Sequence, residues 1–238
     1  ADARDLSVAA APARVLAGER DVVARFDHAS FRFDDADEDT LHDLDFCCRR
    51  GQTTAIIGST GSGKSTVAKL LLRLHDITRG RVLLGDRDVR DITQRELRAR
   101  VSYVPQKAWL FSGTVASNLR DGLPDATEEQ MRHALDVAQS QFVYDLGRGL
   151  DAVVAQGGTN FSGGQRQRLA IARAIIKPAD LYIFDDSFSA LDFKTDAALR
   201  AALTQEMRDS ALLIIAQRIS TILHADQIIV LKDGEVVG

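Results

Sequence analysis

Cysteine, long apolar runs and long basic runs are all scarce in this chain of 238 residues. The two cysteines are the neighbours Cys47 and Cys48, which cannot staple a chain of this size, so a disulfide scaffold is excluded and a reducing compartment is favoured. No apolar run approaches the ~20 residues that a membrane-spanning helix needs. The formal net charge is −4, with acids and bases mixed along the chain, which argues against nucleic acid as a partner.

Apolar residues alternate in some stretches, as in strands, and recur every three to four residues in others, as in helices. This indicates strands that alternate with helices. The expected strands lie within residues 21–33, 41–48, 53–58, 81–89, 101–106, 181–184, 211–216 and 226–231. A helix is expected from Lys64 onward because four apolar residues recur at the spacing of one helix face: Val67, Leu70, Leu71 and Leu74. This order of elements predicts an α/β fold with a mostly parallel sheet.

The middle of the chain, residues 107–177, has a helical character instead. Thr127 precedes Glu128, Glu129 and Gln130, which is typical of a helix N-terminus. A second short helix is expected at 139–146, and a third is opened by Ser162 and closed before Pro178. The sequence therefore predicts an α/β core of residues 21–106 and 178–238 that is interrupted by a helical subdomain.

The stretch GSTGSGKST follows one of the expected strands and opens the first expected helix. Its spacing, G-x4-G-K-[ST], is that of a phosphate-binding loop, in which backbone N–H groups and a helix N-terminus point at phosphate oxygens. Lys64 is expected to reach the β- and γ-phosphates, and the Ser65 hydroxyl is placed for Mg²⁺. The predicted ATP-binding residues here are Gly58, Ser59, Thr60, Gly61, Ser62, Gly63, Lys64, Ser65 and Thr66.

A second polar group follows the apolar run 181–184, where Asp185 ends an expected strand. In open α/β sheets, ligands bind beyond the carboxyl ends of the strands. Asp185 is therefore expected to help hold Mg²⁺ beside the phosphate loop.

These motifs, together with FSGGQ at residues 161–165 and the RQRLAIARAI that follows it, resemble the nucleotide-binding domain of ATP-binding cassette (ABC) transporters over essentially the whole chain. FSGGQ is similar to the family signature LSGGQ, with Phe161 in place of Leu. The resemblance implies an antiparallel β part before the parallel core. It also implies that two cassettes close head to tail, so that each signature contacts the ATP of the other. The signature residues would be Phe161, Ser162, Gly163, Gly164 and Gln165.

Further residues fall where the family has functional groups. The resemblance implies that Gln106 is a Mg²⁺ ligand linked to the membrane domain, and that Phe33 stacks on adenine. It implies a D-loop of Ser189, Ala190, Leu191 and Asp192. Residues 153–160 resemble an exporter-type loop that touches the coupling helices of the membrane domain, although Gln156 stands near the place of a family Glu.

Two positions depart from the family pattern. Asp186 stands where a Glu polarises the attacking water, and its carboxylate is retracted by about 1.5 Å. Gln217 stands in place of the switch histidine, and it can donate a hydrogen bond but cannot carry a positive charge. Asp is still an acid and Gln still a donor, but both changes strike the same step, so we expect ATP to be bound here and hydrolysed poorly.

The resemblance implies the ATPase cassette of an exporter, at the cytoplasmic face of a membrane, with ATP and Mg²⁺ as cofactors. The expected partners are a second, non-identical cassette and a membrane domain, to which the Ala-rich residues 1–20 would be the linker. The damaged Asp186 and Gln217 beside a nearly intact signature resemble one half of a heterodimeric exporter. The alternative is a soluble ABC ATPase without a membrane partner.

Overall fold

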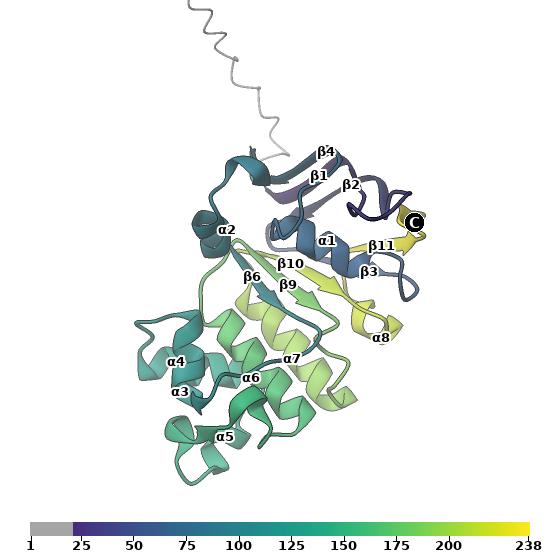
Figure 1. Cartoon of the computed structure of the whole chain (residues 1–238). Coiled ribbons are helices and arrows are strands. Elements are labelled where there is room, and N and C mark those ends of the chain that lie inside the picture. The colour runs from purple at the N-terminus through teal and green to yellow at the C-terminus, as the bar shows by residue number, and fades with distance from the viewer. Residues whose placement is uncertain (1–20) are drawn as a thin grey trace, which may run out of the picture.

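The computed structural model describes residues 21–238, the side chain of Ser220 excepted, so the expected linker 1–20 lies outside the described residues. Two sheets and a group of helices make up this part of the chain (Figure 1). Within residues 21–238, no helix has both the length and the apolar character needed to cross a bilayer.

An antiparallel sheet forms one end of the molecule (Figure 1). Its strand order is β2-β1-β4-β5, with β1 at Val22–Phe31, β2 at Leu41–Arg49, β4 at Arg79–Leu84 and β5 at Arg87–Asp88. The two-residue alternation places Phe26 and Phe46 on the buried face, where their rings stack at 4.7 Å.

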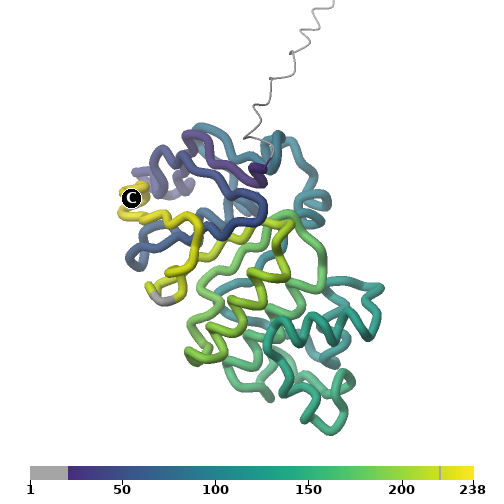
Figure 2. Tube along the Cα trace, turned by 180° about the vertical axis from the view of Figure 1, so that it is seen from behind, coloured from purple at the N-terminus to yellow at the C-terminus, as the bar shows by residue number. Residues whose placement is uncertain are grey.

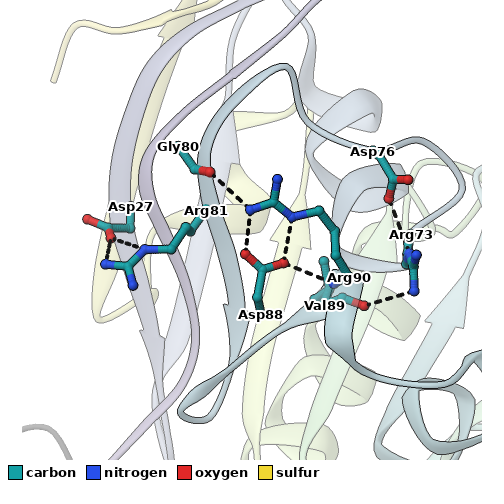
Figure 3. A network of polar contacts seen from close by, with 8 residues as sticks. All are labelled: Asp27, Arg73, Asp76, Gly80, Arg81, Asp88, Val89 and Arg90. Carbon is teal, nitrogen blue, oxygen red and sulfur yellow. Dashed lines mark hydrogen bonds and ion pairs between the residues drawn. The ribbon is translucent and has the colours of Figure 1, made fainter. Parts of the chain in front are cut away.

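Polar residues of this sheet and of the segment after it are paired with one another (Figure 3). Arg81 Nη2 lies 2.5 Å from Asp27 Oδ2, and Arg90 Nη2 lies 2.7 Å from Asp88 Oδ2. Burial raises the pKa of Asp88, but hydrogen bonds from Arg90 outweigh it and leave that pKa below its usual value. These pairs are partly exposed, so they contribute little to stability.

The central sheet has the order β12-β11-β3-β10-β9-β6. All of its neighbouring strands run parallel except β12, which forms an antiparallel hairpin with β11. The strands are β3 (Thr53–Ile57), β6 (Val101–Val104), β9 (Leu181–Asp185), β10 (Ala211–Ile215), β11 (Gln227–Lys232) and β12 (Glu235–Val236). The expected antiparallel part and mostly parallel core are thus confirmed.

Helix α1 (Lys64–Leu71) lies between the two sheets, where it packs in one core with strands of both (Figure 1). The prediction that Leu74 continues its buried face is wrong, because Leu74 is 56% exposed. Arg73, at φ +49°, ends the helix: its N–H bonds to Leu70 O, and the Leu74 N–H bonds to Lys69 O. This is a Schellman motif, which turns the chain away from the helix axis.

The helices from α3 to α7 lie around the other face of the central sheet and at the far end of the molecule (Figures 1 and 2). They are α3 (Val115–Gly122), α4 (Glu128–Val137), α5 (Phe142–Asp145), α6 (Gly163–Ile175) and α7 (Phe193–Glu206). Thr127 caps α4 and Ser162 caps α6, each through the reciprocal bonds of a capping box, as the sequence predicts.

Short elements complete the described chain. Helix α2 (Gln94–Arg100) precedes β6, and α8 (Ile219–Ile222) precedes β11. The strand pair β7 (Gly113–Thr114) and β8 (Val153–Val154) spans the helical part. Three single turns of 3₁₀ helix are η1 (Val89–Asp91), η2 (Gly149–Asp151) and η3 (Gln156–Gly158).

Candidate functional site

The loop between β3 and α1 is shaped as an anion cradle. Gly63 caps α1 in the left-handed conformation at φ +96°, and a Cβ on it would lie 2.5 Å from Leu41 Cδ2. Only glycine fits this position without strain. The first turn of α1 contains no acidic residue, so its N-terminus presents an uncompensated positive dipole end to the loop.

The Lys64 side chain folds back over this loop. Its amine donates to Ser59 O at 2.6 Å and to Gly58 O at 2.8 Å, and it lies 3.5 Å from Ser62 Oγ. Burial lowers the pKa of Lys64, and the charges of Asp186 and Asp185 oppose that shift. The amine is thus a desolvated cation inside the cradle, which suits contact with phosphate.

Asp185 ends β9 beside the start of α1 and is 4% exposed. Ser65 Oγ donates to Asp185 Oδ1 at 3.0 Å, and the Tyr103 hydroxyl donates to Oδ2 at 3.2 Å. Burial raises the pKa of Asp185, and the bonds from Ser65 and Tyr103 counter part of that rise. A hydroxyl and a carboxylate in contact are the hard oxygen ligands that Mg²⁺ takes beside phosphates, so this pair fits the expected metal.

Asp186 follows directly, in the left-handed conformation at φ +46°. Its N–H donates to Ile215 O at 2.8 Å, which fixes the backbone to the end of β10. Its Oδ2 accepts two amide hydrogen bonds, from Gln106 Nε2 at 3.0 Å and from Gln217 Nε2 at 3.3 Å. Gln106 (an expected metal ligand) and Gln217 (at the switch position) therefore both contact Asp186, the expected catalytic acid.

A pocket of about 370 Å³ joins these groups. The residues lining it are Phe33, Thr40, Thr60, Gly61, Gly63, Lys64, Ser65, Thr66, Gln106, Asp185, Asp186, Ile215 and Gln217. Gly58, Ser59 and Ser62 do not line the pocket, but each of them contacts the Lys64 amine. Most of the site residues predicted around the phosphate loop thus come together.

Phe33 lies two residues beyond the end of β1 and is half-buried at the pocket wall. Its ring meets Phe31 edge-on at 4.7 Å and His75 edge-on at 5.3 Å. An aromatic ring held in this way at a pocket wall can stack on a planar base.

Sequence reasoning missed three residues at this site. Thr40 and Ile215 line the pocket, and Tyr103 binds Asp185 from the neighbouring strand β6. The sequence places Tyr103 on an expected strand, within VSYVPQ and two residues before Pro105. It does not show that this strand, β6, pairs with β9, because the two are far apart in the chain.

The five signature residues lie in a different part of the molecule, at the start of α6. Ser162 and Gly163 are exposed at the start of α6, whereas Phe161 is buried and meets Phe142 at 6.1 Å. A Cβ on Gly164 would lie 3.3 Å from Ala190 O, so the helix start packs against the expected D-loop. None of these five residues is among those that line the pocket.

The expected D-loop connects the two places. Ser189 Oγ donates to Asp186 O at 2.8 Å, and Arg218 Nη2 donates to Ser189 O at 2.9 Å. Asp192 caps α7 by accepting a hydrogen bond from the Thr195 N–H. Leu191 is buried, and its Cδ2 atom would lie 3.7 Å from a Cβ on Gly164.

The fold and the loop define a P-loop nucleotide-binding cassette. The ABC transporter family model matches residues 41–189, so the chain belongs to this family. An uncharacterized ABC transporter ATP-binding protein of Mycobacterium tuberculosis is 50% identical over 219 residues, which cover 91% of this chain and 38% of that protein. The Bacillus subtilis protein named "Putative multidrug export ATP-binding/permease protein YgaD" is 38% identical over 213 residues, which cover 89% of this chain and 37% of that protein.

A solved structure of a bacterial Atm1-family ABC exporter with ATP bound matches with a TM-score of 0.86 and 36% identity. The match covers 90% of this chain and 38% of the exporter chain. The chain thus spans less than two fifths of the length of these relatives. It is an ABC ATP-binding domain, and its relatives include a putative multidrug export protein and an Atm1-family exporter.

Proposed function

We propose that this chain is the ATP-driven cassette of a membrane exporter, held at the cytoplasmic face by a membrane domain. The exporter relatives carry this proposal, and the soluble alternative gains no support from them. In the proposed division, residues 21–106 and 178–238 bind the nucleotide, and 107–177 form the helical signature subdomain. The coupling helices of the membrane domain and a second cassette are its partners.

In this proposal the pocket at Lys64 binds Mg-ATP. Lys64 and the loop N–H groups would hold the phosphates, Phe33 the adenine, and Ser65 with Asp185 the Mg²⁺. Gln106 lines the same pocket as Ser65 and Asp185, so its amide oxygen would be a further ligand for the metal. Mg²⁺ would supply charge neutralisation at the phosphates.

The same pocket should hydrolyse ATP poorly. The single observation that carries this is the Asp186 carboxylate, whose Oδ2 is engaged by both Gln106 and Gln217 amides. A general base must reach its water, and here the acid is short and already hydrogen-bonded. No histidine is among the described residues that line the pocket, and His224 lines a separate groove between α7 and β10.

The signature would serve another cassette. Ser162 and Gly163 present an exposed, capped helix start away from the pocket, and an N-terminus of this kind favours an anion. Pairing with a non-identical cassette would let FSGGQ complete that cassette's competent site, while the ATP at Lys64 stays bound.

The test compares the purified wild-type chain with Asp186→Glu, Gln217→His and the double variant. Self-association of this chain would pair its own pocket with its own signature, so ATP turnover reports the chemistry of this site. We expect tight Mg-ATP binding in all four, very slow turnover in the wild type, and a rise of about 10²-fold or more in the double variant.

Wild-type turnover that is well above background and equal to that of the double variant would refute poor hydrolysis at this site. Gln141→His is a matched control, because Gln141 is exposed next to α5, away from the pocket, and the change should leave turnover unaltered.

A further inference from the structure

We propose that Tyr103 is a positioning residue that orients the Asp185 carboxylate for Mg²⁺. The Tyr103 hydroxyl donates to Asp185 Oδ2 at 3.2 Å, and Ser65 Oγ donates to Asp185 Oδ1 at 3.0 Å. Tyr103 does not line the ATP pocket; it lines a separate groove together with Leu72 and Pro105. This inference rests on the proposed binding of Mg-ATP at Lys64.

The sheet register places the two side chains within reach. Strands β6 and β9 run parallel with Tyr103 opposite Ile183, so Asp185 is the next residue of β9 on the same face. That face is the one covered by α1, since Tyr103 and Ile183 pack in the same core as Val67 and Leu70. The half-buried ring packs against this core, and its hydroxyl bonds to the carboxylate.

The phenol is suited to be a permanent donor. A carboxylate can only accept hydrogen bonds, whereas a phenol hydroxyl can donate, so the Tyr103 hydroxyl is the donor to Asp185 Oδ2. A neutral donor on Oδ2 stabilises the ionised carboxylate without competing as a cation for the site.

The two hydroxyls that hold Asp185 are not equivalent. Ser65 is itself an expected ligand of the metal, so its hydroxyl is needed elsewhere when Mg²⁺ is bound. Tyr103 lies outside the pocket and has no such second task. It would then be the remaining side-chain donor that fixes the rotation of the carboxylate, which is how an outer partner tunes a metal ligand.

The test separates Mg²⁺-dependent from Mg²⁺-independent nucleotide binding in the whole chain. The affinity for the fluorescent nucleotide mant-ATP is measured with saturating Mg²⁺ and again in EDTA, and the ratio gives the gain due to the metal. In Tyr103→Phe we expect that gain to fall about fivefold, with the affinity in EDTA within about twofold of wild type. The electron paramagnetic resonance spectrum of bound Mn²⁺ with ATP should change in parallel.

The matched control is Tyr182→Phe. Tyr182 lies on the same strand as Asp185, but its hydroxyl bonds to Lys177 O and Ala179 N, away from the site. This variant should keep the full gain. In an Asp185→Asn background, Tyr103→Phe should produce no further loss, because its target is already altered. If Tyr103→Phe fails to fold, Tyr103→Met keeps an adaptable apolar side chain in the same gap.

Each other result overturns the inference. An unchanged gain in Tyr103→Phe means that the hydroxyl does not orient the carboxylate. An equal loss with Mg²⁺ and in EDTA means that Tyr103 only supports the pocket. Absence of mant-ATP binding in the wild type would refute the proposed function as well, whereas wild-type binding with an unchanged gain refutes the role of Tyr103 alone.

Discussion

The phosphate pocket and the signature are built from the same device, a glycine-rich turn that opens a helix, yet they point their polar groups in opposite directions. At α1 the loop turns inward, and Lys64 and Ser65 bond to groups of the same chain. At α6 the capped start formed by Ser162 and Gly163 is exposed, with nothing within 4 Å of the place where a Gly163 Cβ would be.

This difference means that the phosphate loop belongs to a pocket of this chain, whereas the signature is suited to complete a site on another surface. The first place has a cation, a buried carboxylate and an aromatic wall around a cavity, which are the groups that our proposal uses to bind a nucleotide. The signature has an exposed helix start and two glycines, but none of its residues lines the phosphate pocket. A helix start of this kind is useful when a ligand is presented to it by another surface.

The largest expected effect breaks the phosphate pocket. Lys64→Ala removes the one cation that lies within the loop, so we expect mant-ATP affinity to fall by about 100-fold or more. Lys194→Ala removes an exposed lysine of α7 and serves as the control, with unchanged affinity. Fluorescence titration at constant ionic strength checks both, and a loss below about threefold for Lys64→Ala would contradict the assignment of the pocket.

A smaller effect tests the signature. Ser162→Ala removes the capping box of α6 and should lower the free energy of unfolding by about 1 kcal/mol. Thr127→Ala makes the same loss at α4, so the two variants should be destabilised alike. Affinity for mant-ATP should stay at the wild-type value in both, while ATP-dependent self-association, measured by light scattering, should weaken in Ser162→Ala alone. Equal association in the two variants would contradict an external role for the signature.

Local patterns were enough to predict much of this cassette. The strand–loop–helix at Gly63 and the caps at Thr127 and Ser162 depend on neighbours within a few residues, and the structure has them as predicted. Leu74 shows the limit of periodicity, since a left-handed residue ends α1 before the fourth apolar position. Tyr103 shows a second limit, because its contact with Asp185 spans 82 residues and depends on sheet register.

The smallest expected effect is the pH dependence of the free energy of unfolding, compared for one aspartate at the phosphate pocket and one beside the signature. Burial raises the pKa of Asp185 above the value of about 3.9 for a free aspartate. The folded state therefore holds a proton that the unfolded state has lost, and this group's contribution to stability declines as pH rises from that value through the folded pKa. In EDTA, Asp185→Asn should be more stable than wild type near neutral pH, with the difference vanishing toward pH 4.

Asp192, at the cap of α7 beside the signature, should behave in the opposite sense. Hydrogen bonds from the Thr195 N–H and hydroxyl lower its pKa, so its contribution is present above about pH 3.9 and is lost as pH falls through the folded pKa. Asp192→Asn keeps a capping oxygen and should only flatten that acid loss. Urea unfolding between pH 3 and pH 7 measures both differences. A deficit in Asp185→Asn that grows with pH would show that the hydroxyls of Ser65 and Tyr103 outweigh the burial of the carboxylate.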